Sequence, residues 1–243
     1  MAGVTLAIAA ATDTGLMRKH NEDSLLVREL GDATLLCVAD GLGGHARGEW
    51  ASARAVEVFA DAVAVNLESF HPDEAMSRAA AAANSAVNEE SAALEARGAA
   101  TTLVAALVVG SEAWWLNVGD SRFYAVTRGE FRQVSNDHSW VADRVREGTI
   151  SAETARAHWK RNVVTKTIGF EPLVVPDLGR LDVAAGDCLL LCSDGLFGPV
   201  EDKEIAGVLD EFSTDDAANR LIELANHAGG PDNITVIVAR VEG

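Results

Sequence analysis

Short apolar runs of strand length recur along this chain, with polar or glycine-containing turns between them. Such runs are typical of β-strands. The predicted strands cover residues 6–11, 25–30, 34–39, 102–109, 114–118, 123–126, 188–192 and 234–241. The connection at residues 31–32 is too short for the crossover that parallel strands need, so it favours an antiparallel hairpin.

Four other segments show helical periodicity, and they cover residues 49–70, 72–97, 202–212 and 215–227. The first places apolar residues three and four apart, which gives one apolar face. Gly98 is expected to end the second helix. The fourth is capped by Ser213 and Thr214 and ends at Gly229 and Gly230. This order of elements, without a linker or repeat, predicts one α+β layered domain over residues 1–243.

The composition narrows the class of protein. Hydrophobic residues make up 48% of the chain, which is enough for a large core. The formal net charge of −17 argues against nucleic-acid binding, because such proteins neutralise phosphates with Lys and Arg. An acidic protein that acts on an anion needs local positive charge, most simply from a cation.

The sequence also predicts a cytoplasmic protein without a membrane segment. No apolar stretch approaches the roughly 20 residues of a membrane span, and the N-terminus lacks the pattern of a secretory signal. Cys188 and Cys192 would lie about 13 Å apart along a strand, which is too far for a disulfide. Together with Cys37, they are expected to be buried thiols.

Five aspartates stand at the ends of predicted strands. Asp23 precedes the second strand and Asp40 follows the third, so a hairpin would place them side by side. The same reasoning brings Asp194 beside Asp232, and Asp120 follows another strand. One such aspartate is commonly only a turn residue or a helix cap. Five of them, each beside Gly, Ser or Asn, are better explained by a shared site.

Carboxylates crowded in this way raise one another's pKa and oppose folding unless a cation neutralises them. Oxygen ligands favour Mg²⁺ or Mn²⁺, and the lack of a His and Cys cluster argues against zinc. The glycines after Asp40 would also suit a phosphate-binding loop, but the stretch lacks the Lys and the Ser or Thr of that motif. We therefore predict a metal site in which Gly41 lets a backbone carbonyl approach the ion.

Eight segments in chain order carry a family resemblance. They are residues 12–24, 38–52, 98–108, 116–131, 135–140, 161–169, 189–197 and 229–238, which include TDTGLMRKHNEDS, VADGLGGHARGEWAS, LNVGDSRFYAVTRGEF and GGPDNITVIV. On these motifs the chain resembles the metal-dependent protein phosphatases of the protein phosphatase 2C type, in their compact bacterial form. The resemblance implies a four-layer α-β-β-α fold, with a central antiparallel β-sandwich flanked by helices.

The resemblance also implies a centre with two tightly bound Mg²⁺ or Mn²⁺ ions and a possible third. Asp40 would bridge two ions, with the Gly41 carbonyl as a further ligand. Asp194 and Asp232 would bind the first ion. The other implied roles are Glu22 and Asp23 around the second ion, Asp120 with Asp194 at the third, and Arg18 on the substrate phosphate.

One departure from the family concerns the proton donor. Eukaryotic members carry a histidine two residues after the bridging aspartate, where bacterial members usually have Met and this chain has Leu42. The proton for the leaving oxygen would then come from metal-bound water or from a histidine such as His45, whose alternative role is to order the loop. His138 is expected to be structural.

Residues 140–162 resemble the flap beside the active site of bacterial members, with Ser151 as the cap of a short helix. Five basic residues reverse the acidity of the chain here: Arg144, Arg146, Arg156, Lys160 and Arg161. They would either contact phosphoprotein substrates or simply be solvated.

The resulting hypothesis is a serine/threonine protein phosphatase that hydrolyses phosphoserine and phosphothreonine by attack of a metal-bridging water. Its partners would be phosphorylated proteins, substrates of a Ser/Thr kinase. The alternative is a catalytically silent member that binds a partner, although no expected metal carboxylate is missing. A metal-binding regulator without hydrolysis is a third interpretation, against which Arg18 argues.

Overall fold

The computed structural model describes residues 4–42, 46–93 and 98–242. One sheet contains β1 (Thr5–Asp13), β7 (Arg122–Thr127), β8 (Glu130–Gln133), β10 (Cys188–Cys192) and β11 (Ile234–Glu242). The other contains β2 (Asp23–Leu30), β3 (Ala33–Leu42), β4 (Ala100–Thr101), β5 (Leu103–Val109), β6 (Glu112–Val118) and β9 (Asp177–Asp182). The strand orders are β1-β11-β10-β7-β8 and β2-β3-β5-β6-β9, with β4 beside β3.

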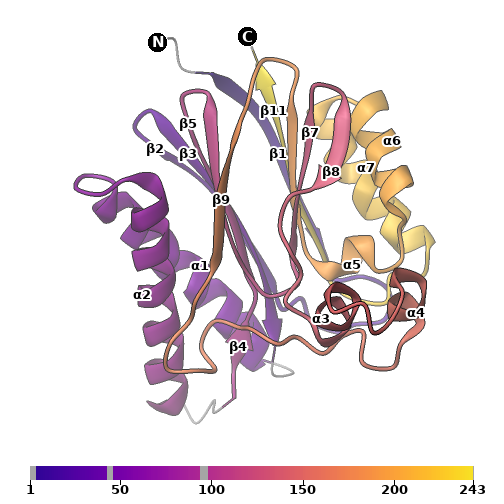
Figure 1. Cartoon of the computed structure of the whole chain (residues 1–243), viewed down its shortest axis with the longest axis horizontal. Coiled ribbons are helices and arrows are strands. Elements are labelled where there is room, and N and C mark those ends of the chain that lie inside the picture. The colour runs from indigo at the N-terminus through magenta and orange to yellow at the C-terminus, as the bar shows by residue number, and fades with distance from the viewer. Residues whose placement is uncertain (1–3, 43–45, 94–97, 243) are drawn as a thin grey trace.

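Helices cover the outer face of each sheet, which confirms the predicted four layers (Figure 1). On one side lie α1 (Ala46–Asn66) and α2 (Pro72–Ala93). On the other lie α5 (Asp194–Phe197), α6 (Asp202–Glu211) and α7 (Thr214–His227). A third buried cluster fills the space between the two sheets. Every pairing between the described strands is antiparallel, as the short turns predict. The pairs are β1–β11, β10–β11, β10–β7, β2–β3, β3–β4, β3–β5, β5–β6, β6–β9 and β7–β8.

The unbroken apolar runs reflect strands that are buried on both faces. In β10, Cys188, Leu190 and Cys192 pack toward the helices, while Leu189 and Leu191 pack into the space between the sheets. Such a strand has no solvent face on which a polar residue would alternate with apolar ones. All three cysteines of the chain are buried free thiols, as predicted.

Three strands were not predicted: the two-residue strand β4, which pairs with β3, and the strands β8 and β9 at sheet edges. β8 and β9 each pair with one neighbour, and Leu181 is the one buried residue in either strand. Their sequences, EFRQ and DLGRLD, are therefore polar and give no apolar run. The short helix α5 was also not predicted.

The helix boundaries differ slightly from the prediction. The first helix covers Ala46–Asn66 instead of residues 49–70, and a turn follows it in which the Asn66 carbonyl accepts hydrogen bonds from the N–H groups of Ser69 and Phe70. The second reaches Ala93, and the predicted residues 94–97 lie outside the described residues. In the last helix Ser213 is the cap, while Thr214 is the first helical residue.

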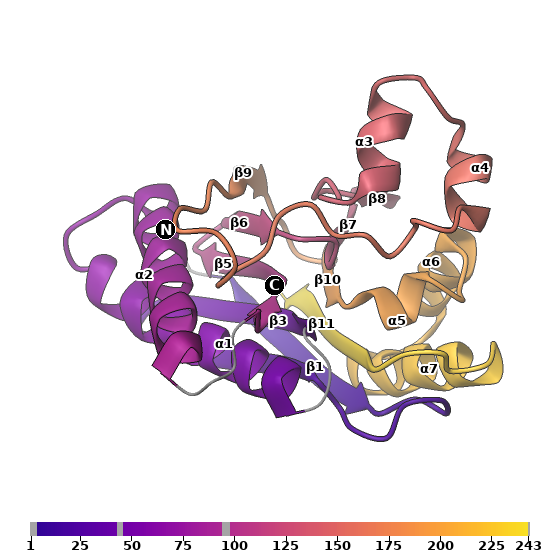
Figure 2. The ribbon, with the colours of Figure 1, turned by 90° about the horizontal axis from the view of Figure 1, so that it is seen from below.

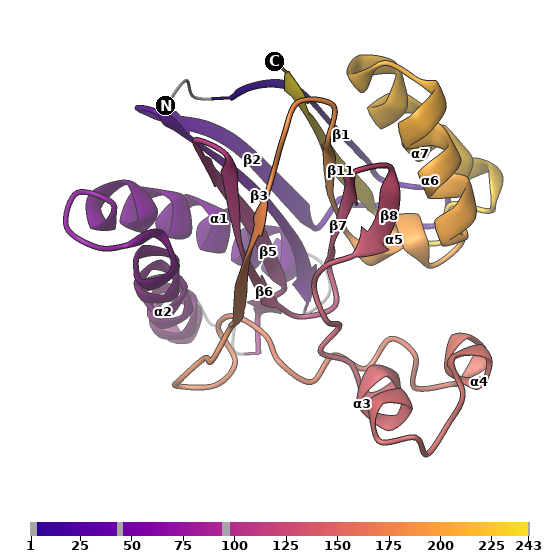
Figure 3. The same cartoon turned by 45° about the horizontal axis from the view of Figure 1, so that its top comes forward.

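A lobe made of α3 (Trp140–Arg146) and α4 (Ala152–Ala157) projects from the sandwich beside α5 and α6 (Figures 2 and 3). Ser139 caps α3, and Ser151 caps α4 as predicted, through a hydrogen bond from the Thr154 N–H to its hydroxyl. The Trp140 ring stacks on His158 with 4.8 Å between ring centroids, which ties the two helices together. None of the described helices has the length and hydropathy to cross a membrane.

The contact between α1 and its sheet gives a test of the layered packing. Phe59 is fully buried in this contact, whereas Val65 on the same helix is 68% exposed. Because truncation leaves a cavity, Phe59→Ala should lower the free energy of unfolding by about 3–5 kcal/mol. The control Val65→Ala should change it by less than about 0.5 kcal/mol. Urea unfolding in the presence of a chelator measures both, and equal effects would contradict the packing.

Candidate metal centre

The first carboxylate pair comes from the hairpin of β2 and β3. Asp23 begins β2, Asp40 lies near the end of β3, and the two are direct partners in the register. The pairing predicted from the sequence is therefore confirmed. Asp40 is partly buried, and Asp23 is 9% exposed.

The second pair comes from the other sheet. Asp194 follows β10 and Asp232 precedes β11, and these strands pair antiparallel. The pairing continues beyond β10, because the Ser193 N–H donates to the Thr235 carbonyl over 3.0 Å. The predicted antiparallel pairing is confirmed, but the two strands do not form a hairpin, because α5, α6 and α7 lie between them in the chain.

Both pairs lie at the same end of the sandwich, opposite the chain termini and near the labels β4 and α5 in Figure 1. Asp120 joins them from the turn between β6 and β7, where it is buried. We call this set, Asp23, Asp40, Asp120, Asp194 and Asp232, the acidic end. Two stacked sheets thus bring together acids that are far apart in the sequence.

Short polar side chains hold the backbone of the acidic end in place. The Thr102 hydroxyl accepts a hydrogen bond from the Asp40 N–H at 2.8 Å, and the Ser193 hydroxyl donates to Asp23 Oδ2 at 2.7 Å. Both side chains are fully buried. Sequence reasoning did not single them out, although each stands beside a strand end that carries an acid.

Asn233 is a further residue that sequence reasoning missed. Its amide oxygen accepts from the Glu22 N–H at 2.8 Å, and its amide nitrogen donates to the carbonyls of Thr14 and His20 at 2.9 Å. The side chain thereby fixes the loop that carries Arg18 against the start of β11. A buried Asn directly after a candidate ligand is the signal that could have indicated this role.

The glycines beside Asp40 are required for close packing. A Cβ on Gly41 would lie 2.1 Å from the Gly48 carbonyl oxygen and 2.5 Å from that of Glu22. A Cβ on Gly48 would lie 2.7 Å from Glu22 Oε2, so this carboxylate fits against the start of α1. The predicted role of the Gly41 carbonyl as a ligand stays a prediction, and Gly43 and Gly44 lie outside the described residues.

Burial and mutual repulsion raise the pKa values at the acidic end. Burial raises the pKa of Asp23 to about 7, and burial with the charge of Asp232 raises that of Asp194 to about 6. The pKa values of Asp40 and Asp120 are also raised well above the ordinary range, first by burial and then by neighbouring carboxylates, including Asp194. At neutral pH the acidic end therefore holds protons that a cation could replace.

The donor set suits a hard divalent cation. Within the described part of the chain, Asp23 Oδ1 and Asp194 Oδ1 are buried and have no hydrogen-bond partner. Among these residues, no group of three or more His, Cys, Asp or Glu side chains is already arranged to hold a metal ion. Mg²⁺ needs no such cage, because it keeps several waters and uses one or two carboxylates. Oxygen ligands without nearby thiols fit Mg²⁺ or Mn²⁺.

Arg18 is the cationic side chain predicted to bind phosphate. Its guanidinium donates to Asp232 Oδ2 over 2.7 Å, which places it at the acidic end. The Arg18 side chain is 48% exposed, so the guanidinium also faces solvent. Its neighbour Lys19 is exposed.

The predicted proton donor is not described by the structure. His45 lies outside the described residues, and Leu42 ends β3. His138 is buried, and its Nδ1 accepts from the Gly119 N–H over 3.1 Å. That contact is consistent with the structural role expected for His138.

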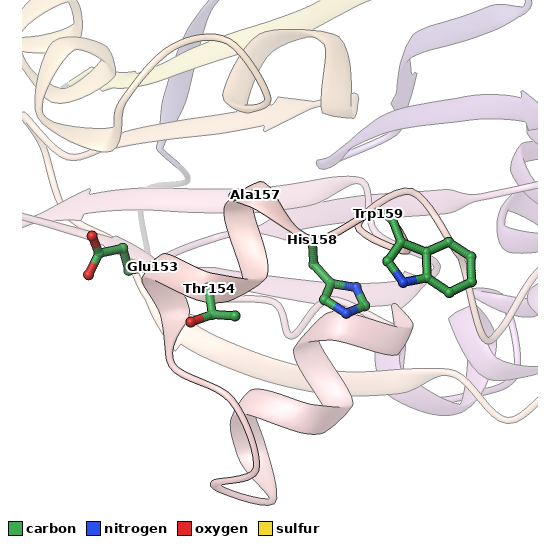
Figure 4. Close-up of a pocket in the computed structure, with 5 residues that line it drawn as sticks. All are labelled: Glu153, Thr154, Ala157, His158 and Trp159. Atoms are coloured by element: carbon green, nitrogen blue, oxygen red, sulfur yellow. The ribbon is translucent and has the colours of Figure 1, made fainter.

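The lobe of α3 and α4 carries an open hollow on its surface. Figure 4 shows its lining, which comes from α4 and the residues after it, and none of these residues belongs to the acidic end: Glu153, Thr154, Ala157, His158 and Trp159. Two of the predicted basic residues have acidic partners inside the lobe, Arg144 with Glu147 at 2.8 Å and Arg146 with Asp143 at 2.5 Å. These ion pairs neutralise part of the positive charge of the lobe.

Comparison with known proteins gives consistent results. A family profile described as protein phosphatase 2C matches residues 17–232. The serine/threonine protein phosphatase PstP of Mycobacterium tuberculosis (strain ATCC 25618 / H37Rv) is 41% identical over 251 residues, which cover 99% of this chain and 46% of PstP. This chain thus spans about half the length of PstP. The serine/threonine phosphatase stp of Listeria welshimeri is 37% identical over 237 residues, which cover 93% of this chain and 92% of that protein.

A solved structure has the same fold. It is the catalytic domain of the serine/threonine protein phosphatase PstP in complex with two manganese ions, which has a TM-score of 0.87 and 37% identity and covers 99% of this chain and 100% of that one. The family profile spans most of the chain, and relatives above 30% identity cover nearly all of it. The chain therefore belongs to the protein phosphatase 2C family.

Proposed function

We propose that this chain is a metal-dependent protein serine/threonine phosphatase and that residues 1–243 form its catalytic domain. The observation that carries the proposal is the acidic end itself, where five buried or partly buried carboxylates meet one guanidinium. The names of the relatives, serine/threonine phosphatases, support the same activity.

The cofactor is Mg²⁺ or Mn²⁺, and the two manganese ions in the PstP structure support this choice. Asp40 would be shared by two ions, with the Gly41 carbonyl as a further ligand, and Asp194 and Asp232 would bind the first ion. Glu22 and Asp23 would lie around the second ion, and Asp120 with Asp194 would hold a third. When bound, such ions lower the pKa of a water and stabilise charge on the phosphoryl oxygens.

Arg18 binds the substrate phosphate in this proposal. Its guanidinium presents a planar fork of donors that matches phosphate oxygens. The contact with Asp232 orients it toward the acidic end, and its exposure leaves donors accessible from solvent. The group that protonates the leaving oxygen stays a prediction, with His45 as the candidate.

The substrates are phosphorylated proteins, and a Ser/Thr kinase would produce them. The net charge of −17 argues against nucleic acid as a partner. The three buried thiols support a cytoplasmic location, where cysteines stay reduced. A catalytically silent regulator is the alternative that the following measurements would reveal.

Asp40→Asn tests the metal centre directly. The substitution removes a charged oxygen ligand, so kcat should fall by more than about 100-fold, beyond the range for residues that only support ligands. Mn²⁺ binding measured by calorimetry should weaken while the thermal transition in chelator persists. Asp182→Asn, an exposed aspartate in β9, is the control and should behave like the wild type. Near-normal turnover of Asp40→Asn would contradict the proposal.

Arg18→Ala tests phosphate binding. Charge-assisted hydrogen bonds contribute about 1.5–3 kcal/mol, so KM should rise roughly 10- to 100-fold while kcat changes little. Steady-state kinetics on a phosphopeptide at saturating Mn²⁺ separates the two constants. Lys19→Ala removes a neighbouring positive charge and should leave both unchanged. A fall in kcat with an unaltered KM would speak against ground-state phosphate binding by Arg18.

Metal binding should release protons near neutral pH. The pKa of Asp23 is raised to about 7 and that of Asp194 to about 6, so the folded apoprotein keeps protons that the unfolded chain loses near pH 4. Without metal, stability should therefore fall as the pH rises from about 4 to 7. Calorimetry at pH 6.5 in two buffers of different ionisation enthalpy should show proton release on Mg²⁺ addition. Identical apparent enthalpies after correction for dilution would refute this expectation.

A further inference from the structure

His138 holds the turn before Asp120 through two hydrogen bonds with Gly119. Its side chain is 3% exposed, and it lies between β8 and α3. The His138 N–H donates to the Gly119 carbonyl at 2.9 Å, and the Gly119 N–H donates to His138 Nδ1 at 3.1 Å. One residue thus satisfies both backbone groups of Gly119.

The other ring nitrogen, Nε2, lies beside residues that follow the lobe in the sequence. Because Nδ1 accepts a hydrogen bond, the neutral ring carries its hydrogen on Nε2, which lies 3.0 Å from Asp177 Oδ1. Lys166 donates to the same oxygen over 3.1 Å. Burial and the charge of Lys166 lower the pKa of His138, which agrees with a neutral ring. The imidazole is therefore fixed at both nitrogens.

The turn that His138 holds is connected to Asp40 as well as to Asp120. Gly119 has a φ of +110°, and a Cβ there would lie 2.6 Å from Thr102 Cβ, so this turn packs directly on Thr102. The Ser121 hydroxyl is 2.7 Å from the Thr102 hydroxyl, which in turn accepts from the Asp40 N–H at 2.8 Å. A shift of the turn would therefore move Asp120 and loosen the support of Asp40.

We propose that His138 is a positioning residue for the metal centre and that it acts by accepting the Gly119 N–H hydrogen bond. Asp177 and Lys166 orient the ring, the ring fixes Gly119, and Gly119 places Asp120 against Thr102. The proposal rests on the proposed function, because it assigns Asp120 to a divalent ion. It does not place His138 on the substrate.

Two polar variants separate the two ring contacts. The amide of His138→Asn reaches the place of Nδ1 and keeps an acceptor for Gly119. The amide of His138→Gln reaches the place of Nε2 and keeps the contact with Asp177. Residues that support metal ligands change metal affinity by about 10- to 100-fold. His138→Gln should therefore weaken Mn²⁺ binding about tenfold or more, and His138→Asn should stay within about threefold of the wild type.

The measurement is Mn²⁺ titration of the full chain, followed by calorimetry and by the spin-resonance signal of free Mn²⁺. Equal affinities in both variants and the wild type would overturn the proposal, and so would equal weakening in both variants. If His138→Gln does not fold, His138→Asn alone decides, since a tenfold weakening in it is incompatible with the proposed acceptor role.

A double-mutant cycle distinguishes positioning from general destabilisation. Asp120→Asn should weaken binding of one Mn²⁺ ion, and His138→Gln should add little further loss in its background. Additive losses would overturn the proposal.

Asp187→Ala is the control, because buried Asp187 accepts from the N–H groups of Arg128 and Ala184 at the opposite end of β10. It should lower the melting temperature and leave Mn²⁺ affinity unchanged.

The same titration tells the two proposals apart. If Asp40→Asn binds Mn²⁺ as tightly as the wild type, the metal centre itself fails. If Asp40→Asn weakens binding and His138→Gln does not, only the positioning role of His138 fails.

Discussion

Mutual repulsion among carboxylates is the constraint on which the rest of this structure depends. Asp23, Asp40, Asp120, Asp194 and Asp232 meet at one end of the sandwich, where burial raises the pKa of four of them, Asp23, Asp40, Asp120 and Asp194. Such a group opposes folding in the absence of a cation, so the remaining structure must hold it in place. Two sheets with buried faces supply this rigidity, because each acid lies within two residues of a strand end and not on a long loop.

The fixed geometry depends on small polar residues as much as on the acids. Thr102, Ser193 and Asn233 are buried, and each satisfies or orients backbone beside a candidate ligand. Hydrogen bonds of this kind limit the positions that a carboxylate can take before an ion arrives. Gly41 and Gly48 contribute in a different way, since any side chain at either position would separate β3 from the start of α1.

The sequence predicted the parts of the fold in which burial and pattern agree. Strands such as β10 are apolar at every position because both faces are covered, and the hairpin geometry of Asp23 and Asp40 followed from the length of one turn. The edge strands β8 and β9 were not predicted, because strands with exposed positions can carry polar residues and therefore show no apolar run. The supporting roles of Thr102 and Asn233 were also missed, since a hydroxyl or an amide carries no periodicity that indicates a long-range partner.

An acidic protein that binds a phosphate must reverse its own charge at the binding site. At the acidic end, the guanidinium of Arg18 already faces Asp232, so this cation offsets carboxylate charge before any substrate arrives. Although the raised pKa values keep part of the acidic end protonated, the Arg18 guanidinium is already paired with Asp232, and any other ionised carboxylate would repel an approaching dianion. Divalent cations remove this repulsion and leave the solvent-exposed donors of Arg18 available to the phosphate. The charge distribution itself therefore favours bound metal, in addition to the chemistry that the ions would supply.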